Sequence, residues 1–158
     1  MPNEPSASNI SSTERTLYVA ASCDPQAGRG AWGLYSPHDT KPLSDSGFRR
    51  ETTVNQLGLM AVAQTLSRAT GSSHLVFVSE NAYLVDNFGD RLNAWAEQGW
   101  KGADGKSVKN AAQWQAIHAA QQRRTFTIRR PTDPEMVMIE QAKKLAQRCA
   151  RKHAARAA

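Results

Sequence analysis

The chain has 158 residues and a formal net charge of +6, from 20 Lys and Arg against 14 Asp and Glu. This length suits one domain that buries its own core without disulfides or structural metal ions. The two cysteines, Cys23 and Cys149, match neither a disulfide framework nor a metal knuckle, so we expect a reducing, cytoplasmic setting. The N-terminus has no basic start and no apolar run, and we therefore expect neither a signal peptide nor a membrane anchor.

The composition changes along the chain and predicts three regions. Residues 1–15 are polar and carry no hydrophobic pattern, which is typical of a disordered leader. Residues 16–152 contain all the periodic segments and form the predicted domain. Residues 153–158 are a short basic tail. Much of the positive charge follows Arg123, so a polyanion is a reasonable partner.

Three strands are predicted first. Residues 16–23 (TLYVAASC) and 30–37 (GAWGLYSP) are rich in aromatic and β-branched residues and are separated by a turn that contains glycine, which indicates a hairpin. Residues 42–50 (PLSDSGFRR) are more polar and fit a third antiparallel strand at the edge of a sheet.

Helices and two further strands follow. Residues 52–70 have Leu59, Val62, Ala63 and Leu66 at helical spacing, although Gly58 within this helix costs about 1 kcal/mol relative to Ala. The apolar run 74–80 (HLVFVSE) is typical of a buried parallel strand. The remaining predictions are short helices at 81–89, 91–100 and 111–122, a polar loop at 101–110, a strand at 125–130 and a final amphipathic helix.

This order predicts an α/β fold: a mixed five-stranded sheet, with three antiparallel strands and then parallel strands, flanked by helices. The final helix should place one apolar stripe on that sheet, formed by Met138, Ala142, Leu145, Ala146 and Cys149.

The order of the elements and four strings in the sequence resemble the type 1 ribonuclease H family, and the resemblance covers roughly residues 16–150. The longest is WAEQGWKGADGKSVKNAAQW at 95–114, which resembles the substrate-binding protrusion of the family. The others are SCDPQAGRGAWG, TTVNQLGLMA and DPEMVMIEQA. The resemblance implies a ribonuclease H-like fold and an enzyme that cuts the RNA strand of RNA–DNA hybrids with two Mg²⁺ ions.

The resemblance also places the four catalytic carboxylates of the family on Ala20, Gly58, Glu80 and Glu140. Ala20 and Gly58 supply no ligand, and two metal ions need several carboxylates. We therefore expect no catalytic residues and no bound metal, with Glu80 and Glu140 as weak candidates for one Mg²⁺ or Mn²⁺ ion. Otherwise these two glutamates are separated by water or paired with Arg129 or Arg130.

A rearranged metal site would need a third carboxylate, and the candidates that could move into it are Asp24, Asp45 and Glu51. Turn and edge-strand carboxylates are usually solvated, however. The mobile histidine loop of the family is represented by RRPTDPE, which has no histidine.

Several residues resemble positions that contact nucleic acid in the family. Lys101, Lys106 and Lys109 could follow a phosphate backbone, while Trp95 and Trp100 either stack on bases or pack inside the protrusion. Gln26 and Asn55 resemble minor-groove contacts, although Val54 and Ala82 replace two further polar residues, so that 2′-hydroxyl recognition is only partly present. The basic face of the last helix is either solvated or a second patch, His153 is a tail residue, and His118 has no predicted partner.

We therefore expect a catalytically inactive ribonuclease H-like protein that binds nucleic acid, either an RNA–DNA hybrid or duplex RNA or DNA. One alternative is an active, metal-dependent hybrid ribonuclease whose site is rearranged around Glu80, Glu140 and a third carboxylate. Another is a protein-interaction module on a nuclease scaffold, because a fold does not fix an activity.

Overall fold

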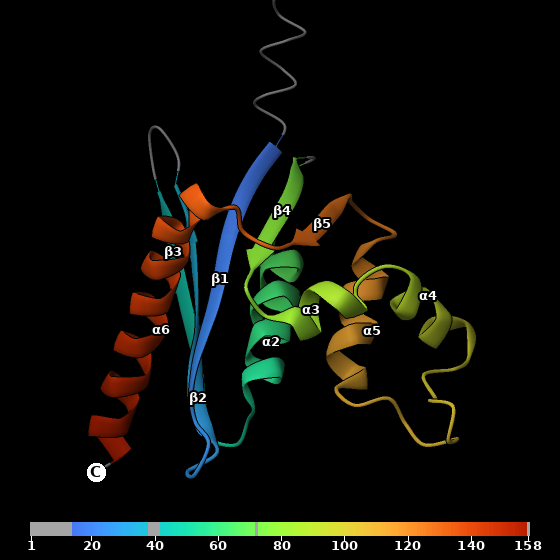
Figure 1. Cartoon of the computed structure of the whole chain (residues 1–158), viewed down its shortest axis with the longest axis horizontal. Helices are drawn as coiled ribbons and strands as arrows, with labels where there is room; N and C mark the ends of the chain where they lie inside the picture. Colours follow the sequence, from blue (N-terminus) through green and yellow to red (C-terminus); the bar gives the residue numbers. More distant parts are fainter. Residues whose placement is uncertain (1–13, 38–41, 72, 158) are drawn as a thin grey trace, which may run out of the picture.

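The computed structural model describes residues 14–37, 42–71 and 73–157, so most of the predicted leader lies outside it. Figure 1 shows the elements in chain order. The strands are β1 (Glu14–Asp24), β2 (Arg29–Ser36), β3 (Leu43–Arg49), β4 (His74–Ser79) and β5 (Phe126–Arg129). The helices are α2 (Val54–Arg68), α3 (Ala82–Asn87), α4 (Asp90–Glu97), α5 (Ala111–Ala120), the short 3₁₀ helix η1 (Asp133–Glu135) and α6 (Met136–Ala157).

The five strands form one sheet in the order β3-β2-β1-β4-β5. β1 pairs antiparallel with β2, and β2 pairs antiparallel with β3. β4 lies parallel to both β1 and β5. The predicted mixed sheet is therefore confirmed, and the polar third strand is at its edge.

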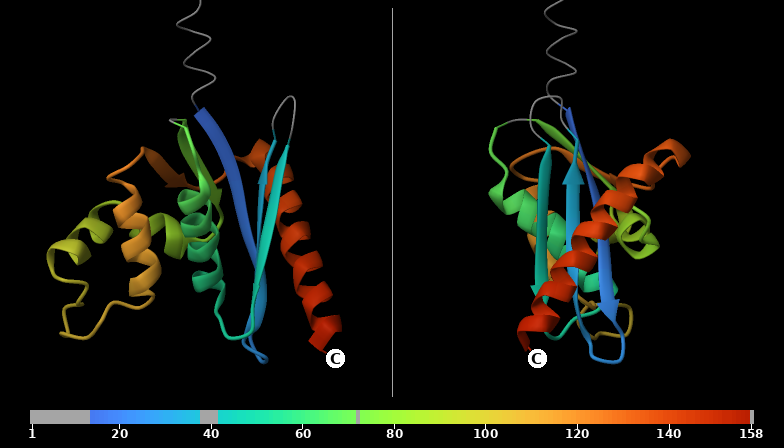
Figure 2. Two further views of the ribbon diagram at one scale, coloured as in Figure 1. Left: turned by 180° about the vertical axis from the view of Figure 1, so that it is seen from behind. Right: turned by 90° about the vertical axis from the view of Figure 1, so that its left-hand side faces the viewer.

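The helices cover the two faces of the sheet unequally. α6 packs on one face against β1, β2 and β3, whereas α2, α3 and α5 lie on the other side (Figures 1 and 2). The larger core is on the α2 side and includes Leu57, Phe77 and Trp114. The smaller core joins α6 to the sheet through Ala142, which the predicted apolar stripe included, and through Ile139, which it did not.

The close approach of α6 to the sheet depends on Gly33 in β2. A Cβ atom at this position would collide with the backbone of α6 at Ala142 and Ala146. Only glycine leaves room for helix backbone at that distance from a strand. This contact lies beside Ala20, the partner of Gly33 on β1.

Both ends of the described chain differ from the sequence prediction. β1 begins at Glu14, which pairs with His74, because Glu14 and Arg15 extend the ladder with β4. α6 continues to Ala157, and so His153 belongs to a helix and not to a tail. Its ring stacks on Phe48 with centroids 4.5 Å apart. Over the part of the chain that the structure describes, no helix is both long and apolar enough to cross a membrane.

Candidate functional site

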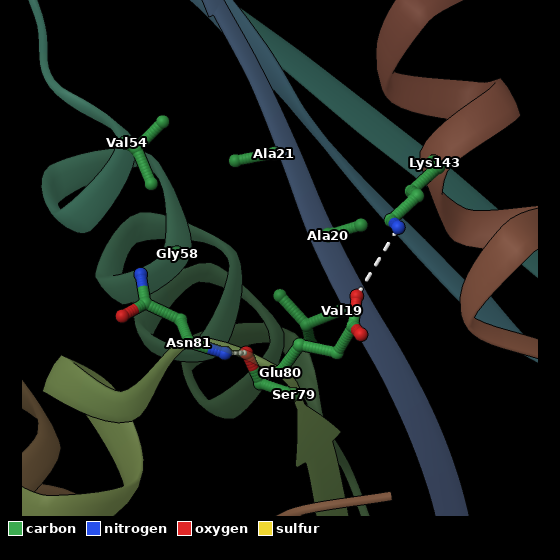
Figure 3. A pocket seen from close by; sticks show the side chains of 9 residues that line it. All are labelled: Val19, Ala20, Ala21, Val54, Gly58, Ser79, Glu80, Asn81 and Lys143. Carbon is green, nitrogen blue, oxygen red and sulfur yellow. Dashed lines mark hydrogen bonds and ion pairs between the residues drawn. The ribbon is translucent and has the colours of Figure 1, made fainter. Parts of the chain in front are cut away.

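An open cavity of about 330 Å³ lies where β1, β4, α2 and α6 meet (Figure 3). It contains three of the four positions at which the resemblance places carboxylates, namely Ala20, Gly58 and Glu80. Its full lining is Val19, Ala20, Ala21, Val54, Gly58, Ser79, Glu80, Asn81 and Lys143. The fold therefore brings together three of the four positions that the family resemblance singles out.

Strand register explains why Glu80 lies beside β1. Val19 of β1 is the partner of Ser79 in the parallel ladder, so the residues that follow them, Ala20 and Glu80, lie side by side. Glu80 comes directly after the last residue of β4, where the chain leaves the sheet. Its carboxylate is therefore 45% exposed at the rim of the cavity.

Gly58 reaches the cavity from the first half of α2. This helix begins after Thr53, whose side chain accepts a hydrogen bond from the Gln56 backbone N–H, the usual N-cap arrangement. A Cβ atom at Gly58 would lie 3.0 Å from both terminal carbons of the fully buried Leu84 side chain. Space for a larger side chain is therefore limited at this position.

The Lys143 ammonium contacts both glutamates of the predicted set. Its Nζ atom is 3.1 Å from Glu80 Oε1 and 3.4 Å from Glu140 Oε2. Glu140 lies one helical turn before Lys143 on α6, whereas Glu80 comes from the end of β4. The hydrogen bond with Glu80, followed by the weaker interaction with Glu140, raises the pKa of Lys143 and keeps it charged.

The predicted arginine partners are engaged elsewhere, and that prediction was wrong. Arg129 forms two hydrogen bonds, of 2.8 and 3.0 Å, to the carboxylate of Glu135. Arg130 pairs with Asp86 at 3.5 Å. Both arginines lie at the end of β5, so α6 itself supplies the cation nearest to Glu80 and Glu140.

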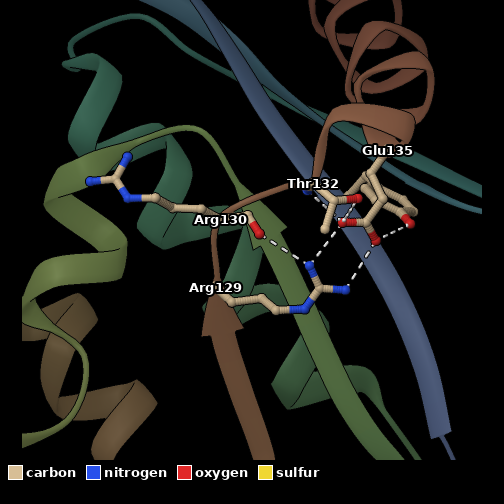
Figure 4. A network of polar contacts seen from close by, with 5 residues as sticks. Arg129, Arg130, Thr132 and Glu135 are labelled. Atoms are coloured by element: carbon tan, nitrogen blue, oxygen red, sulfur yellow. Dashed lines mark hydrogen bonds and ion pairs between the residues drawn. The ribbon is translucent and has the colours of Figure 1, made fainter.

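The Glu135 carboxylate is the centre of a polar network that ties the start of α6 to the sheet (Figure 4). Besides Arg129, it accepts hydrogen bonds from the Thr132 backbone N–H at 2.9 Å and from the Tyr18 hydroxyl at 2.8 Å. The bond from Arg129 is the largest cause that lowers the pKa of Glu135. Burial, and then the Glu135 carboxylate, raise the pKa of Tyr18 to about 12.

The three carboxylates considered as replacements do not line the cavity. Asp24 accepts hydrogen bonds from the backbone N–H groups of Gln26 and Ala27, within the β1–β2 turn. Asp45 pairs with Arg68 at 3.2 Å. Glu51 is exposed in the connection between β3 and α2.

Comparison with known sequences decides the family. The RNase H family model matches residues 12–130, which is most of the chain. The chain belongs to the RNase H family. It is 30% identical over 112 residues to the ribonuclease H of Agrobacterium fabrum, covering 71% of this chain and 77% of that protein. It is 34% identical over 111 residues to the ribonuclease H of Paracoccus denitrificans, covering 67% and 72%.

Solved structures with the same fold agree with this assignment. The crystal structure of LC9-RNase H1, described as a type 1 RNase H with the type 2 active-site motif, matches with a TM-score of 0.69 at 20% identity. The match covers 87% of this chain and 72% of that one. The foamy viral protease-reverse transcriptase in complex with an RNA/DNA hybrid matches with a TM-score of 0.68 at 17% identity, over 85% of this chain and 19% of that one.

The residues of this RNase H family member do not fit the two-metal centre that its resemblance implies. Mg²⁺ requires oxygen ligands in near-octahedral geometry, and neither Ala20 nor Gly58 has a side-chain oxygen. The remaining pair, Glu80 and Glu140, shares the Lys143 ammonium. Within residues 14–37, 42–71 and 73–157, no group of three or more His, Cys, Asp or Glu side chains could hold a metal ion.

The protrusion formed by α4, the following loop and α5 extends away from the sheet on the side opposite α6 (Figures 1 and 2). Trp95 and Trp100 are partly buried there against the larger core. Trp95 packs beside Trp114 with ring centroids 5.8 Å apart, and Trp100 contacts His118 edge-on at 5.7 Å. His118, which had no predicted partner, thus helps to hold the protrusion.

Most of the polar candidates for nucleic-acid contact are exposed, whereas the two tryptophans are partly buried. Lys101, Lys106 and Lys109 are exposed on the protrusion, and none forms a salt bridge with a described residue. Gln26 is exposed in the β1–β2 turn. Asn55 accepts a hydrogen bond of 3.0 Å from the Asn81 side chain at the edge of the cavity. Their contact with nucleic acid stays a prediction.

Lys143 is the charged residue of the cavity that sequence reasoning missed. It belongs to the basic face of the last helix, which was expected to be solvated or to form a second patch. Its spacing of three from Glu140 predicts contact between those two side chains on a helix. Contact with Glu80, which is 63 residues away in the sequence, depends on how α6 is rotated on the sheet.

Proposed function

We propose that this RNase H family member binds nucleic acid, an RNA–DNA hybrid or another duplex, without cleaving it and without a metal cofactor. The observation that carries the proposal is the cavity itself. Ala20 and Gly58 occupy two positions at which the family resemblance expects carboxylates, and Lys143 contacts the two glutamates that remain. Phosphodiester hydrolysis with two metal ions has no ligand set in this arrangement.

Two exposed basic regions support binding to a polyanion. One is the protrusion with its three lysines. The other is the second half of α6, which has no Asp or Glu after Glu140 and carries exposed Arg148, Arg151 and Lys152. Neighbouring positive charges favour phosphate backbones of any sequence through counterion release. Foamy viral relatives of the fold have been seen with an RNA/DNA hybrid and with double-stranded DNA, which favours the same class of partner.

The second candidate is an active hybrid ribonuclease, and one observation favours it: the relatives at about 30% identity carry the name ribonuclease H. In that case Mg²⁺ or Mn²⁺ would act at Glu80, Glu140 and a further carboxylate. The cost of this alternative is structural, because Lys143 would have to leave both glutamates and another acidic residue would have to enter the cavity.

One assay separates the two candidates. Labelled RNA–DNA hybrid, double-stranded RNA and double-stranded DNA are incubated with the protein in Mg²⁺ and then in Mn²⁺. Anisotropy reports binding and denaturing gels report cleavage. We expect binding and an intact RNA strand. Cleavage of the hybrid that Glu140→Gln abolishes would overturn the proposal and establish the enzyme. Cleavage that Glu140→Gln leaves unchanged indicates a contaminating nuclease, and the assay is then repeated on repurified protein.

We also place the protein in a reducing compartment, the cytoplasm. Cys23 and Cys149 are both free thiols and both partly buried. Burial, and then the nearby Asp24 carboxylate, raise the pKa of the Cys23 thiol, so the reactive thiolate form is disfavoured.

A further inference from the structure

The cation nearest to the two remaining glutamates is part of the chain. Lys143 Nζ lies 3.1 Å from Glu80 Oε1 and 3.4 Å from Glu140 Oε2, which are ion-pair distances to two carboxylates at once. The three residues come from β4 and α6, two elements held in place by the packed sheet. Figure 3 shows the ammonium directed across the cavity toward Glu80.

Glu80 at the rim of the cavity and Glu140 one helical turn before Lys143 both contact the same ammonium. Neighbouring carboxylates repel each other, and a cation between them offsets that repulsion. A nucleic-acid backbone that approaches the cavity adds further negative charge, so the need for a cation increases on binding. A divalent ion can supply this charge, but it must be recruited from solution. The Lys143 ammonium supplies it permanently and has three N–H donors, of which the two glutamates account for two.

We propose that Lys143 is the built-in cation of this site: it holds Glu80 and Glu140 in place of a divalent metal ion and makes nucleic-acid binding independent of metal. The claim about nucleic-acid binding, which we call the nucleic-acid half, rests on the proposed function. The claim that Lys143 replaces a metal ion, the metal half, concerns the free protein and can be tested without any nucleic acid. Removal of the ammonium should therefore convert the pair of glutamates into a weak site for divalent cations.

The metal half is tested by Mn²⁺ titration followed by electron paramagnetic resonance, with thermal shift in parallel. Wild-type protein should show no saturable Mn²⁺ binding. Lys143→Met should bind about one equivalent with a dissociation constant on the order of 10⁻³ M, the range of weak carboxylate sites. Lys144→Met is the matched control, because it removes the same charge from the neighbouring exposed position on α6.

A further variant shows where the ion binds. Adding Glu80→Gln to Lys143→Met should abolish the acquired Mn²⁺ binding, because one of the two carboxylates is lost. Circular dichroism and the thermal midpoint establish that each variant is folded. If Lys143→Met does not fold, Lys143→Gln replaces it, since the amide is also uncharged and its polar end suits a side chain that is 38% exposed.

The nucleic-acid half is tested by hybrid affinity in EDTA and in Mg²⁺ at constant ionic strength. Wild type should bind equally in both. Lys143→Met should bind the hybrid several-fold more weakly than wild type in EDTA and should regain wild-type affinity in Mg²⁺. Lys144→Met should lose affinity by the same small factor in EDTA and in Mg²⁺.

Two results would overturn the inference: saturable Mn²⁺ binding by the wild-type protein, or Mn²⁺ behaviour of Lys143→Met that matches Lys144→Met. Absence of binding by the wild type to the hybrid, to double-stranded RNA and to double-stranded DNA would instead refute the proposed function. The Mn²⁺ titration would still decide the role of Lys143, so the two failures are distinguishable.

Discussion

Glu135→Gln is expected to destabilise the fold, because this carboxylate joins β1, β5 and the start of α6. The change removes the charge that pairs with Arg129 and leaves an amide in contact with the Tyr18 hydroxyl. Hydrogen bonds to charged groups contribute about 1.5–3 kcal/mol each, and a broken buried pair costs about 3–5 kcal/mol. Glu135 is 18% exposed but Arg129 is 43% exposed, so solvent screening reduces the expected loss to about 2 kcal/mol.

Urea denaturation at pH 7 measures this loss, and it corresponds to a fall of about 4–8 °C in the thermal midpoint for a chain of this size. Glu97→Gln, an exposed glutamate on α4, is the control and should change stability by less than about 0.5 kcal/mol. If Glu135→Gln lowers the free energy of unfolding by no more than the control does, the Glu135 carboxylate does not stabilise the fold.

The pH dependence of the same variant gives an independent check. The folded-state pKa of Glu135 is lowered, so its contribution is present above the unfolded-state pKa of about 4.3 and is lost as the pH falls below it. The difference in stability between wild type and Glu135→Gln should therefore shrink from pH 5 to pH 3. A difference that is constant over this range would mean that the ionised carboxylate is not responsible.

Three further changes have definite expected outcomes. Gly58→Glu should lower the free energy of unfolding in urea by up to about 2 kcal/mol, because crowding of the buried Leu84 side chain costs about 1–3 kcal/mol and loss of the helical glycine returns about 1 kcal/mol. An increase in stability would mean that the Leu84 contact relaxes freely. Gly33→Ala should cost about 3 kcal/mol or more, since its methyl group meets α6 backbone, and stability equal to wild type would contradict that packing. Lys106→Gln should reduce the slope of log affinity against log salt concentration by about 0.9, because the lysine would neutralise one phosphate of a bound DNA duplex. An unchanged slope would mean that Lys106 does not contact a phosphate.

The order and type of the elements could be predicted from the sequence because their signals are local. Segments rich in aromatic and β-branched residues indicated β1 and β2, and the apolar run of β4 indicated a buried parallel strand. The apolar stripe of α6 correctly identified the face that packs on the sheet. The family resemblance added the positions of Ala20, Gly58 and Glu80, which the structure brings to one cavity.

The ion pairs could not be predicted in the same way, because they depend on distances between elements far apart in the sequence. Arg129 is closer to Glu140 along the chain than Lys143 is to Glu80, yet the fold turns Arg129 toward Glu135. The rotation of α6 on the sheet, which Gly33 permits, decides that Lys143 reaches Glu80. His153 was misassigned for a related reason, since its partner Phe48 lies on a distant strand.

The most direct test of the account is the affinity of the wild-type protein for an RNA–DNA hybrid, measured with and without Mg²⁺ at the same ionic strength. The state of the RNA strand is checked in each sample. We predict the same affinity in both conditions and an intact RNA strand, because Lys143 already supplies the cation of the site. Affinity that requires Mg²⁺, or a hybrid that is cut when Mg²⁺ is added, would contradict it.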